Sequence, residues 1–271
     1  MRLMQSSPSE PMTATAMAHP NVALIKYWGK RDTSSNLPAV GSLSVTLGAL
    51  RTETTVRFDE SLDTDLLVLN GTEQPAEHPR LMACMDALRE LAGRPVFAEV
   101  LSDNDFPTGA GLASSASGYA ALVTAAAAAL GIDAQDPRLL DISRIGSGSA
   151  PRSLFGGVAV LRNAGDGTTC EQLIRPEDWS LSVVVAVTTE AAKATTSRDG
   201  MEQSRLTSPY YERWIATHEE DMVAAIGFVH DRNFVALAEL AEHNCLKMHE
   251  ANRSHHIFFV GRDPSLVIRR G

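Results

Sequence analysis

Cysteine is scarce in this sequence, which holds three cysteines among 271 residues. Cys84, Cys170 and Cys245 lie far apart, and the sequence has neither a Cys-x-x-Cys nor a His-Glu-x-x-His motif. A disulfide framework and a zinc site are therefore not indicated, and no metal-ligand residues are assigned. Unpaired thiols are typical of reducing compartments, so we expect buried free thiols and a cytoplasmic protein.

Positive charge is also in deficit, with 24 Lys and Arg against 33 Asp and Glu and a formal net charge of −9 at pH 7. Such a surface repels the phosphates of nucleic acids and of anionic lipids, so neither is an expected partner. No apolar run is long enough to span a bilayer, and residues 1–15 lack the apolar core of a signal peptide. We expect residues 1–17 to be a disordered lead-in to a soluble protein.

Two widespread nucleotide-binding motifs are missing as well. No Gly-x-Gly-x-x-Gly follows a first strand, and no Lys follows the glycines of residues 107–118, as the Gly-x4-Gly-Lys-Ser type of loop requires. Strand-like and helix-like segments are mixed without a regular β-α-β rhythm, and there are no internal repeats. These absences favour an α+β fold over a doubly wound parallel sheet.

The spacing of apolar residues predicts where helices and strands lie. Strands are expected at residues 42–47, 54–58, 66–69, 95–101 and 154–161, with a buried strand at 181–187 and turns at Asn70-Gly71 and 163–167. Helices are expected at residues 79–91 and 136–145, and a third should begin in the Gly- and Ser-rich residues 107–118 and run to about residue 130. Two amphipathic helices should follow, with Ile226 and Leu237 on their apolar faces.

Four polar segments hold the candidate site residues. They are segment A (26–32, Lys-Tyr-Trp-Gly-Lys-Arg-Asp), segment B (107–118, Pro-Thr-Gly-Ala-Gly-Leu-Ala-Ser-Ser-Ala-Ser-Gly), segment C (146–153, Gly-Ser-Gly-Ser-Ala-Pro-Arg-Ser) and segment D (195–201, Thr-Thr-Ser-Arg-Asp-Gly-Met). In segment B the glycines let N–H groups converge, the serines add donors, and the helix that follows adds the positive end of its dipole. These features predict an anion site. Taken alone, segment B is also explained as a Ser-capped helix start.

Segments A, C and D add cations and further hydroxyl groups. Arg152 in segment C can hold a carboxylate or a phosphate through two parallel N–H bonds, which a lysine cannot do. Taken alone, each segment is also explained as a solvated turn. Four such segments in one acidic chain indicate a pocket for a polyanionic substrate and a nucleotide.

These segments are similar to those of the diphosphomevalonate decarboxylase family. That family belongs to the superfamily of galactokinase, homoserine kinase, mevalonate kinase and phosphomevalonate kinase (the GHMP kinases). The resemblance rests on residues 21–32, 104–118, 146–152, 197–201 and 244–249 (Asn-Cys-Leu-Lys-Met-His), and it covers about residues 18–248. The Pro-x3-Gly-Leu-x-Ser-Ser core of segment B is common to the superfamily. Lys-Tyr-Trp-Gly-Lys and Gly-Ser-Gly-Ser-Ala-x-Arg-Ser are particular to the decarboxylases.

The resemblance implies a GHMP-kinase-like fold in two parts. Residues 18–178 are expected to form an N-terminal domain, similar to ribosomal protein S5 domain 2, that binds nucleotide and substrate. Residues 179–271 are expected to form a ferredoxin-like C-terminal domain that is incomplete in this sequence.

The resemblance also implies roles for single residues. Substrate contacts are implied for Lys26, Tyr27, Trp28, Gly29, Lys30, Arg80, Ser147, Gly148, Ser149, Ala150, Pro151, Arg152, Ser197 and Arg198. ATP contacts are implied for Asn104, Pro107, Thr108, Gly109, Ala110, Gly111, Leu112, Ser114, Ser115 and Ser117. Arg152, which would hold the substrate carboxylate, and Lys30 are the expected catalytic residues. A turn role for Asn104 and a solvated position for Arg80 stay open.

The implied reaction is the ATP-dependent conversion of (R)-5-diphosphomevalonate to isopentenyl diphosphate, ADP, phosphate and CO₂, a step of the mevalonate pathway of isoprenoid (lipid) biosynthesis. ATP phosphorylates the tertiary hydroxyl group, and loss of phosphate then drives decarboxylation. The implied cofactors are ATP and Mg²⁺, with the ion held largely by phosphates and water. The expected partners are these small molecules, neither nucleic acid nor membrane, and a homodimer is left open.

One feature of the family has no counterpart in the sequence. The Asp-Ala-Gly-Pro-Asn loop, whose Asp acts on the C3 hydroxyl group, is not found, and Asp263 lacks its sequence context. We therefore expect a chain truncated at its C-terminus, poorly stable and weakly active, with an unpaired strand edge at residues 181–187. Two alternatives stay open: a catalytically silent homologue or ligand-binding remnant, and a related mevalonate-phosphate decarboxylase or kinase.

Overall fold

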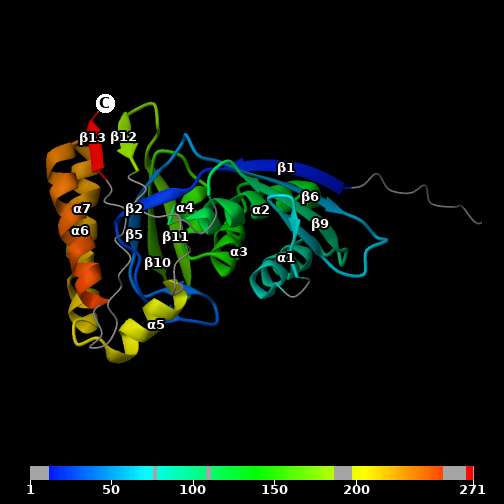
Figure 1. Cartoon of the computed structure of the whole chain (residues 1–271), viewed down its shortest axis with the longest axis horizontal. Coiled ribbons are helices and arrows are strands. Elements are labelled where there is room, and N and C mark those ends of the chain that lie inside the picture. The colour runs from blue at the N-terminus through cyan, green and yellow to red at the C-terminus, as the bar shows by residue number, and fades with distance from the viewer. Residues whose placement is uncertain (1–11, 76–77, 108–110, 186–196, 253–266, 271) are drawn as a thin grey trace, which may run out of the picture.

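Helices and strands are mixed along the chain, which confirms the expected α+β class. The computed structural model describes residues 12–75, 78–107, 111–185, 197–252 and 267–270, the last of these as backbone only. Figure 1 shows sheets and helices following one another along the long axis of the molecule. No helix in the described ranges has both the length and the apolar character that crossing a bilayer requires.

The first sheet has five strands in the order β1-β6-β9-β7-β8. They are β1 (Met12–Ala18), β6 (Thr52–Phe58), β9 (Ala98–Asn104), β7 (Leu66–Leu69) and β8 (Thr72–Glu73). All neighbouring strands are antiparallel except β7 and β9, which run parallel. Asn70 and Gly71 have φ of 49° and 71°, which is the left-handed backbone of a tight hairpin between β7 and β8. The predicted Asn-Gly turn is confirmed.

Helix α2 (Ser114–Leu130) packs on this sheet, and α1 (Pro79–Ala92) and α3 (Arg138–Gly146) pack against α2 and each other. Their apolar side chains form one core with strand residues such as Val56 and Phe58. α2 is buried around most of its circumference, which its many small alanine side chains permit. It also contacts Ala18 and Leu154 through a second cluster, so it joins the first sheet to segment C.

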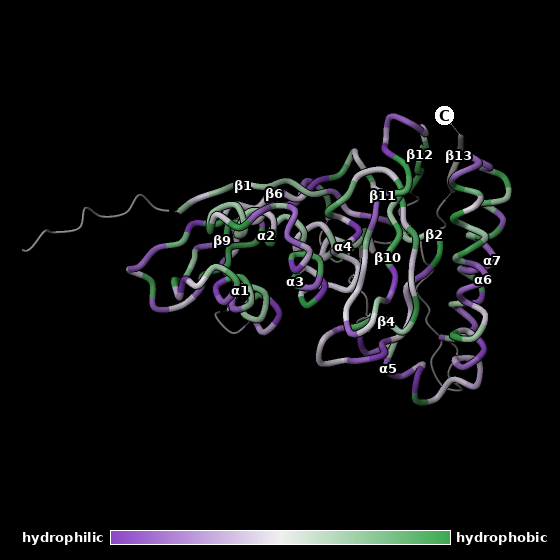
Figure 2. The backbone as a smooth tube through the Cα atoms, turned by 180° about the vertical axis from the view of Figure 1, so that it is seen from behind, coloured by the Kyte–Doolittle hydropathy of each residue, from purple (hydrophilic) through white to green (hydrophobic). Residues whose placement is uncertain are grey.

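The second sheet has the strand order β11-β10-β5-β2 and is antiparallel throughout. Its strands are β11 (Gly167–Ile174), β10 (Val158–Ala164), β5 (Ser42–Thr46) and β2 (Asn21–Ile25). Helices α6 (Tyr211–His230) and α7 (Phe234–Ala251) lie side by side along this sheet, as Figures 1 and 2 show. Met222 and Val229 of α6 and Leu237 of α7 share a core with the strands.

Short elements complete the described structure. β3 (Lys30–Asp32) pairs with β4 (Leu37–Pro38), and β12 (Leu181–Val184) pairs with β13 (Val267–Arg270). Segment C contains the single-turn helix α4 (Ala150–Ser153), and the described part of segment D begins α5 (Ser197–Thr207). The described residues of segment D therefore form the start of a helix and not a solvated turn.

The structure corrects two expectations, the disordered lead-in and the buried strand at residues 181–187. Residues 12–17 of the expected lead-in belong to β1, because β6 supplies backbone partners and Met12 and Ala16 pack on the first core. β12 alternates between half-buried and exposed positions, so the expectation of a buried strand is wrong for these residues. Among the described residues β12 pairs with β13 alone, so one of its edges is paired and the expected unpaired edge is the other. The apolar faces expected for α6 and α7 are confirmed, since Ile226 packs on the same core that contains Leu237.

The thiols differ from one another in burial. Cys84 is buried, whereas Cys170 and Cys245 are only partly buried, so the expectation of buried thiols holds for Cys84 alone. The division of the chain between residues 178 and 179 stays a prediction.

Candidate active site

Arg152 of segment C is 2% exposed and forms the centre of the candidate site. Its Nε donates to Ser44 Oγ (3.0 Å), its Nη2 donates to Asn21 Oδ1 (3.2 Å), and its Nη1 donates to Ser42 Oγ. These partners are uncharged, and burial lowers the pKa of Arg152 to about 10. Within the described residues no carboxylate is hydrogen-bonded to the guanidinium group. A buried positive charge without a counter-charge favours the binding of an anion.

Tyr27 of segment A faces segment C. A Cβ atom on Gly148 would lie 2.6 Å from Tyr27 Oη, so glycine is required for this close approach. The Tyr27 hydroxyl group is buried and has no hydrogen-bond partner among the described residues. Burial raises the pKa of Tyr27 to about 12, although the charges of Arg152, Arg144 and Arg198 oppose this shift. Among the described residues the phenol is therefore a neutral donor without a partner, and it feels the positive charges of three arginines.

Lys30 belongs to a cluster of cations. It is 9% exposed at the start of β3. Burial lowers the pKa of Lys30 to about 8, and the positive charges of Arg198 and Arg80 act in the same direction, with a smaller opposing effect of Glu202. Arg80 Nη1 donates to the Gly146 carbonyl at the start of segment C (3.3 Å). Cations from segments A and D and from α1 thus meet in one region, which suits a polyanion.

Serine hydroxyl groups connect segment B to segment C. Ser147 Oγ lies 3.2 Å from Ser115 Oγ and 3.2 Å from Ser149 Oγ. Gly111 and Ala113 have φ of 88° and 54°, so the chain enters α2 through two residues in the left-handed region. No side chain caps α2, so the alternative of a Ser-capped helix start is wrong. First-turn N–H groups, the helix dipole and nearby hydroxyl groups together fit a phosphate.

The other predicted residues are placed as follows. Pro107, Gly111 and Ser115 are exposed, Leu112 and Ser114 are half-buried, Ala150 and Pro151 are buried in α4, and Ser197 and Arg198 are exposed at the start of α5. Thr108, Gly109 and Ala110 lie outside the described residues, as does Asp263.

Two residues predicted to contact ATP serve instead in internal packing. Ser117 is 0% exposed, and its Oγ lies 2.6 Å from Thr52 Oγ1 in β6. Its hydroxyl group therefore fixes α2 to the first sheet and does not face a phosphate. Asn104 Oδ1 accepts from the same Thr52 Oγ1 (2.6 Å), and the Asn104 backbone N–H donates to Asn70 Oδ1 (2.9 Å). These bonds favour the structural role for Asn104.

Segment A is held against helices α5 and α6. Trp28 Nε1 donates to Ser204 Oγ (3.0 Å), and the Trp28 carbonyl accepts from Trp214 Nε1 (3.0 Å). Gly29 has φ of 96°, and a Cβ atom there would lie 2.2 Å from Tyr211 Oη. Both the backbone angle and the close contact require glycine. Helices α5 and α6 therefore hold segment A in position through their contacts with Trp28 and Gly29.

Hydrogen bonds also hold the two ends of segment A in place. The backbone N–H of Lys26 donates to Asn244 Oδ1 (2.8 Å), and Asn244 Nδ2 donates to Asp221 Oδ2 (2.7 Å). Asp32 accepts from the hydroxyl group and the backbone N–H of Ser34 at 2.6 and 2.7 Å. These bonds lower the pKa of Asp32 to about 2. Asp32 is therefore a weak proton acceptor at neutral pH.

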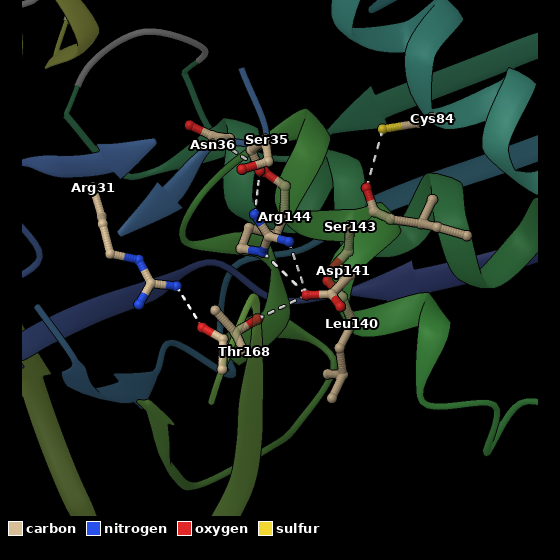
Figure 3. Close-up of polar contacts among 11 residues, drawn as sticks. Arg31, Ser35, Asn36, Cys84, Leu140, Asp141, Ser143, Arg144 and Thr168 are labelled. Atoms are coloured by element: carbon tan, nitrogen blue, oxygen red, sulfur yellow. Dashed lines mark hydrogen bonds and ion pairs between the residues drawn. The ribbon is translucent and has the colours of Figure 1, made fainter. Parts of the chain in front are cut away.

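Arg144 was not among the residues predicted from the motifs; it is 4% exposed in the last turn of α3. Its Nε and Nη2 donate to Asp141 Oδ1 (3.2 and 2.9 Å) and its Nη1 donates to the Ser35 carbonyl, as Figure 3 shows. Asn36 Nδ2 donates to the Arg144 carbonyl (2.5 Å), and Thr168 Oγ1 donates to Asp141 Oδ1 (3.1 Å). This network fixes the residues that lead into segment C.

The partners of Arg152 were also missed as site residues. Asn21 is the first residue of the 21–32 motif, which was the available signal. Ser42 and Ser44 are both 0% exposed in β5 and belong to no motif, so their position in the sheet alone reveals them.

Comparisons with known proteins identify the family. A model described as the diphosphomevalonate decarboxylase-like N-terminal domain matches residues 18–172, and one described as the mevalonate 5-diphosphate decarboxylase C-terminal domain matches residues 183–257. The chain belongs to the diphosphomevalonate decarboxylase family. The family inferred from the sequence motifs is thereby confirmed.

Individual relatives support the same family assignment. Diphosphomevalonate decarboxylase from Candida albicans is 38% identical over 247 residues, covering 84% of this chain and 68% of the relative. Mevalonate diphosphate decarboxylase from Staphylococcus aureus superimposes with a TM-score of 0.84 at 38% identity, covering 92% of this chain and 77% of that one. MDDEF in complex with MVAPP, AMPPCP and magnesium gives a TM-score of 0.80 at 38% identity, covering 89% and 75%. These diphosphomevalonate decarboxylase structures confirm the GHMP-kinase-like fold.

The curated relatives are longer than this chain. The matched regions span 68% of the Candida albicans decarboxylase and 64% of those from Ganoderma lucidum and Bos taurus, or about two thirds of their length.

Proposed function

We propose that this chain catalyses the ATP-dependent decarboxylation of diphosphomevalonate to isopentenyl diphosphate. The observation that carries the proposal is the arrangement of cations around Tyr27, in which Arg152 is buried without a counter-charge. The serines of segments B and C lie beside it. The substrate carries a carboxylate at one end and a diphosphate at the other, which Arg152 and the cluster of Lys30, Arg80 and Arg198 can complement.

The carboxylate end is assigned to Arg152. Asn21, Ser42 and Ser44 accept N–H bonds from all three nitrogens of the guanidinium group and fix its orientation. A carboxylate can accept from the N–H bonds that remain on the terminal nitrogens, which supplies both charge and direction. The buried Tyr27 hydroxyl group is a further donor for the substrate.

The diphosphate end is assigned to Lys30, Arg80 and Arg198, with the Ser197 hydroxyl group beside Arg198 at the start of α5. These cations repel one another in the absence of an anion, which contributes to the lowered pKa of Lys30. A bound diphosphate would relieve that repulsion. Binding energy at this end serves to position the reacting carbon atoms.

ATP is assigned to segment B. The left-handed turn at Gly111 and Ala113, the first turn of α2 and the Ser115 hydroxyl group fit its phosphates. The described residues contain no group of three or more His, Cys, Asp or Glu that could hold a metal ion. Mg²⁺ would therefore be held mainly by phosphate oxygens and water, where it neutralises charge on the transferred phosphoryl group.

The chemistry follows from the substrate. The C3 hydroxyl group leaves poorly, so the γ-phosphoryl group of ATP is transferred to its oxygen, with ADP as the leaving group and the hydroxyl proton released to solvent. The C3–O bond then breaks with its electron pair going to phosphate. The electron pair of the C1–C2 bond forms the C2–C3 double bond as CO₂ departs. Arg152 keeps the carboxylate ionised and oriented, and the cations and donors stabilise charge on the phosphoryl group.

Product analysis tests the proposal. The purified 271-residue chain is incubated with Mg-ATP and either diphosphomevalonate or the monophosphate. Equal amounts of ADP and CO₂ from diphosphomevalonate support the proposal, and ADP without CO₂ would indicate a kinase. Turnover of the monophosphate alone would reassign the substrate, and no turnover despite binding would indicate a silent homologue. A cytoplasmic location and a homodimer stay predictions.

A further inference from the structure

Tyr119 of α2 lies at the border between the first core and the cluster of Lys30, Arg80 and Arg198. Its side chain is 8% exposed and belongs to that core, in the second turn of the helix. Burial raises the pKa of Tyr119 to about 12, although the charges of Arg80 and Arg198 oppose this shift. The phenol is therefore neutral at physiological pH, and it feels two of the cations assigned to the diphosphate. None of segments A to D includes Tyr119.

Arg80 lies over the ring of Tyr119. Arg80 Cζ is 5.6 Å from the ring centroid, a distance at which the negative face of an aromatic ring attracts a guanidinium group. Arg80 Nη1 also donates to the Gly146 carbonyl (3.3 Å). The residue is nevertheless exposed, so a ligand can reach it. An exposed arginine ordinarily samples many rotamers, whereas the ring and the carbonyl group restrict this one.

Gly146 allows the ring to take this position. A Cβ atom on Gly146 would lie 2.0 Å from Tyr119 Cδ1 and 2.4 Å from its Cγ, so any other residue would displace the ring. Gly146 is the last residue of α3 and the first of segment C. Its backbone thus packs against the ring and also accepts the hydrogen bond from Arg80.

The helices that carry these residues are fixed to one another. Cys84 of α1, Ile142 of α3 and Tyr119 belong to the same core. Cys84 Sγ donates to the Ile142 carbonyl (3.3 Å), a bond that Figure 3 shows. The ring therefore has a defined place relative to the backbone that carries Arg80. A leucine at position 119 would be apolar as well, but it has no ring face to attract the guanidinium group.

We propose that Tyr119 is a positioning residue for the diphosphate and holds the Arg80 guanidinium group in its binding orientation before the ligand arrives. The inference rests on the assignment of the diphosphate end to Lys30, Arg80 and Arg198 in the proposed function. Ordering one long side chain during binding weakens affinity by about twofold to tenfold, and an arginine that is already ordered avoids this loss. Tyr119 acts through Arg80 and makes no bond to the ligand.

A double-mutant cycle tests the inference, with inorganic diphosphate titrated into the 271-residue chain by calorimetry. Arg80→Met should weaken binding by about tenfold or more, because a charge-assisted bond is lost. Tyr119→Leu should weaken it by about fivefold, within the range expected for ordering one side chain. Tyr119→Phe keeps the ring and should match wild type. In the Arg80→Met background Tyr119→Leu should have no further effect, because no guanidinium group is left to position.

Controls separate positioning from damage to the fold. Phe97→Leu is the matched control, because Arg89 Cζ lies 5.2 Å from the Phe97 ring and neither residue belongs to the candidate site; its affinity should equal that of wild type. Mevalonate has the carboxylate but no diphosphate, so NMR titration should give the same affinity for wild type and Tyr119→Leu. Unequal mevalonate affinities would overturn the positioning role. Thermal melting checks the fold, and if Tyr119→Leu melts without cooperativity, Tyr119→Met takes its place.

Failure of the inference can be told from failure of the assignment beneath it. No binding of inorganic diphosphate, or equal affinity of wild type and Arg80→Met, would overturn the assignment of the diphosphate and the positioning role with it. Loss of affinity in Arg80→Met but not in Tyr119→Leu would overturn the positioning role alone. The same would follow from equal losses on Tyr119→Leu in both backgrounds, or from Tyr119→Phe binding as weakly as Tyr119→Leu.

Discussion

Arg152→Lys separates two properties of this side chain, its charge and its hydrogen-bond geometry. A guanidinium group has five N–H bonds. Ser44 takes the Nε proton, while Ser42 and Asn21 take one proton from each terminal nitrogen. One N–H bond is left on each terminal nitrogen, so up to two remain for a ligand carboxylate. A lysine ammonium group keeps the charge, but it cannot serve three internal partners and a ligand together.

The size of the effect follows from the bonds that are lost. Loss of one charge-assisted bond to the substrate costs about 1.5–3 kcal/mol, which raises the Kd by about 10-fold to 150-fold. The internal bonds to Asn21 and the two serines also weaken, so the free energy of unfolding should fall by about 1–3 kcal/mol. We therefore expect weaker binding by a protein that still folds.

Calorimetric titration with diphosphomevalonate measures the affinity, and chemical denaturation measures the stability. Ser44→Ala removes a support of Arg152 but leaves the unused N–H bonds of its terminal nitrogens, so it should lower stability with little change in Kd. Arg175→Lys is a surface control, since the side chain of Arg175 is 60% exposed, and it should change neither quantity. Equal affinity of wild type and Arg152→Lys in well-folded protein would refute the assignment of the carboxylate to Arg152.

Three further predictions concern the nucleotide, the diphosphate and the fold. Gly111→Val should abolish binding of a fluorescent ATP analogue, because φ is 88° there and a side chain would block the phosphates; undiminished binding would exclude segment B as the nucleotide site. Affinity for diphosphomevalonate should fall as the pH rises through about 8, because Lys30 loses its proton there. Titrations at a series of pH values should show a weaker pH dependence for Lys30→Met, and an unchanged dependence in this variant would contradict the role of Lys30. Arg89→Met should lower the free energy of unfolding by about 3–5 kcal/mol, because Asp65 would stay buried without its bidentate partner at 2.9 and 3.0 Å. Denaturation measures this, and a loss below about 1 kcal/mol would contradict it.

Local sequence patterns predicted the elements whose causes are local. The Asn70-Gly71 turn, the strand at Leu66–Leu69 and the helix start at Pro79 lie where the sequence places them. Turn chemistry and a proline in the first helical turn act on adjacent residues, so they need no tertiary information. β1 was missed because its order depends on pairing with β6, as between Thr15 and Thr55, 40 residues apart.

The sequence by itself determined the family and the four segments that carry the candidate site, because residue types and short spacings define those motifs. Only the tertiary structure decided how the segments work together. Arg152 is held by Ser44, Ser42 and Asn21, which lie 108, 110 and 131 residues away in the chain. Packing of α2 on the first sheet also buries the Ser117 side chain. Burial and long-range pairing are properties of the packed chain, and no local pattern encodes which hydroxyl group will face a ligand and which a neighbouring strand.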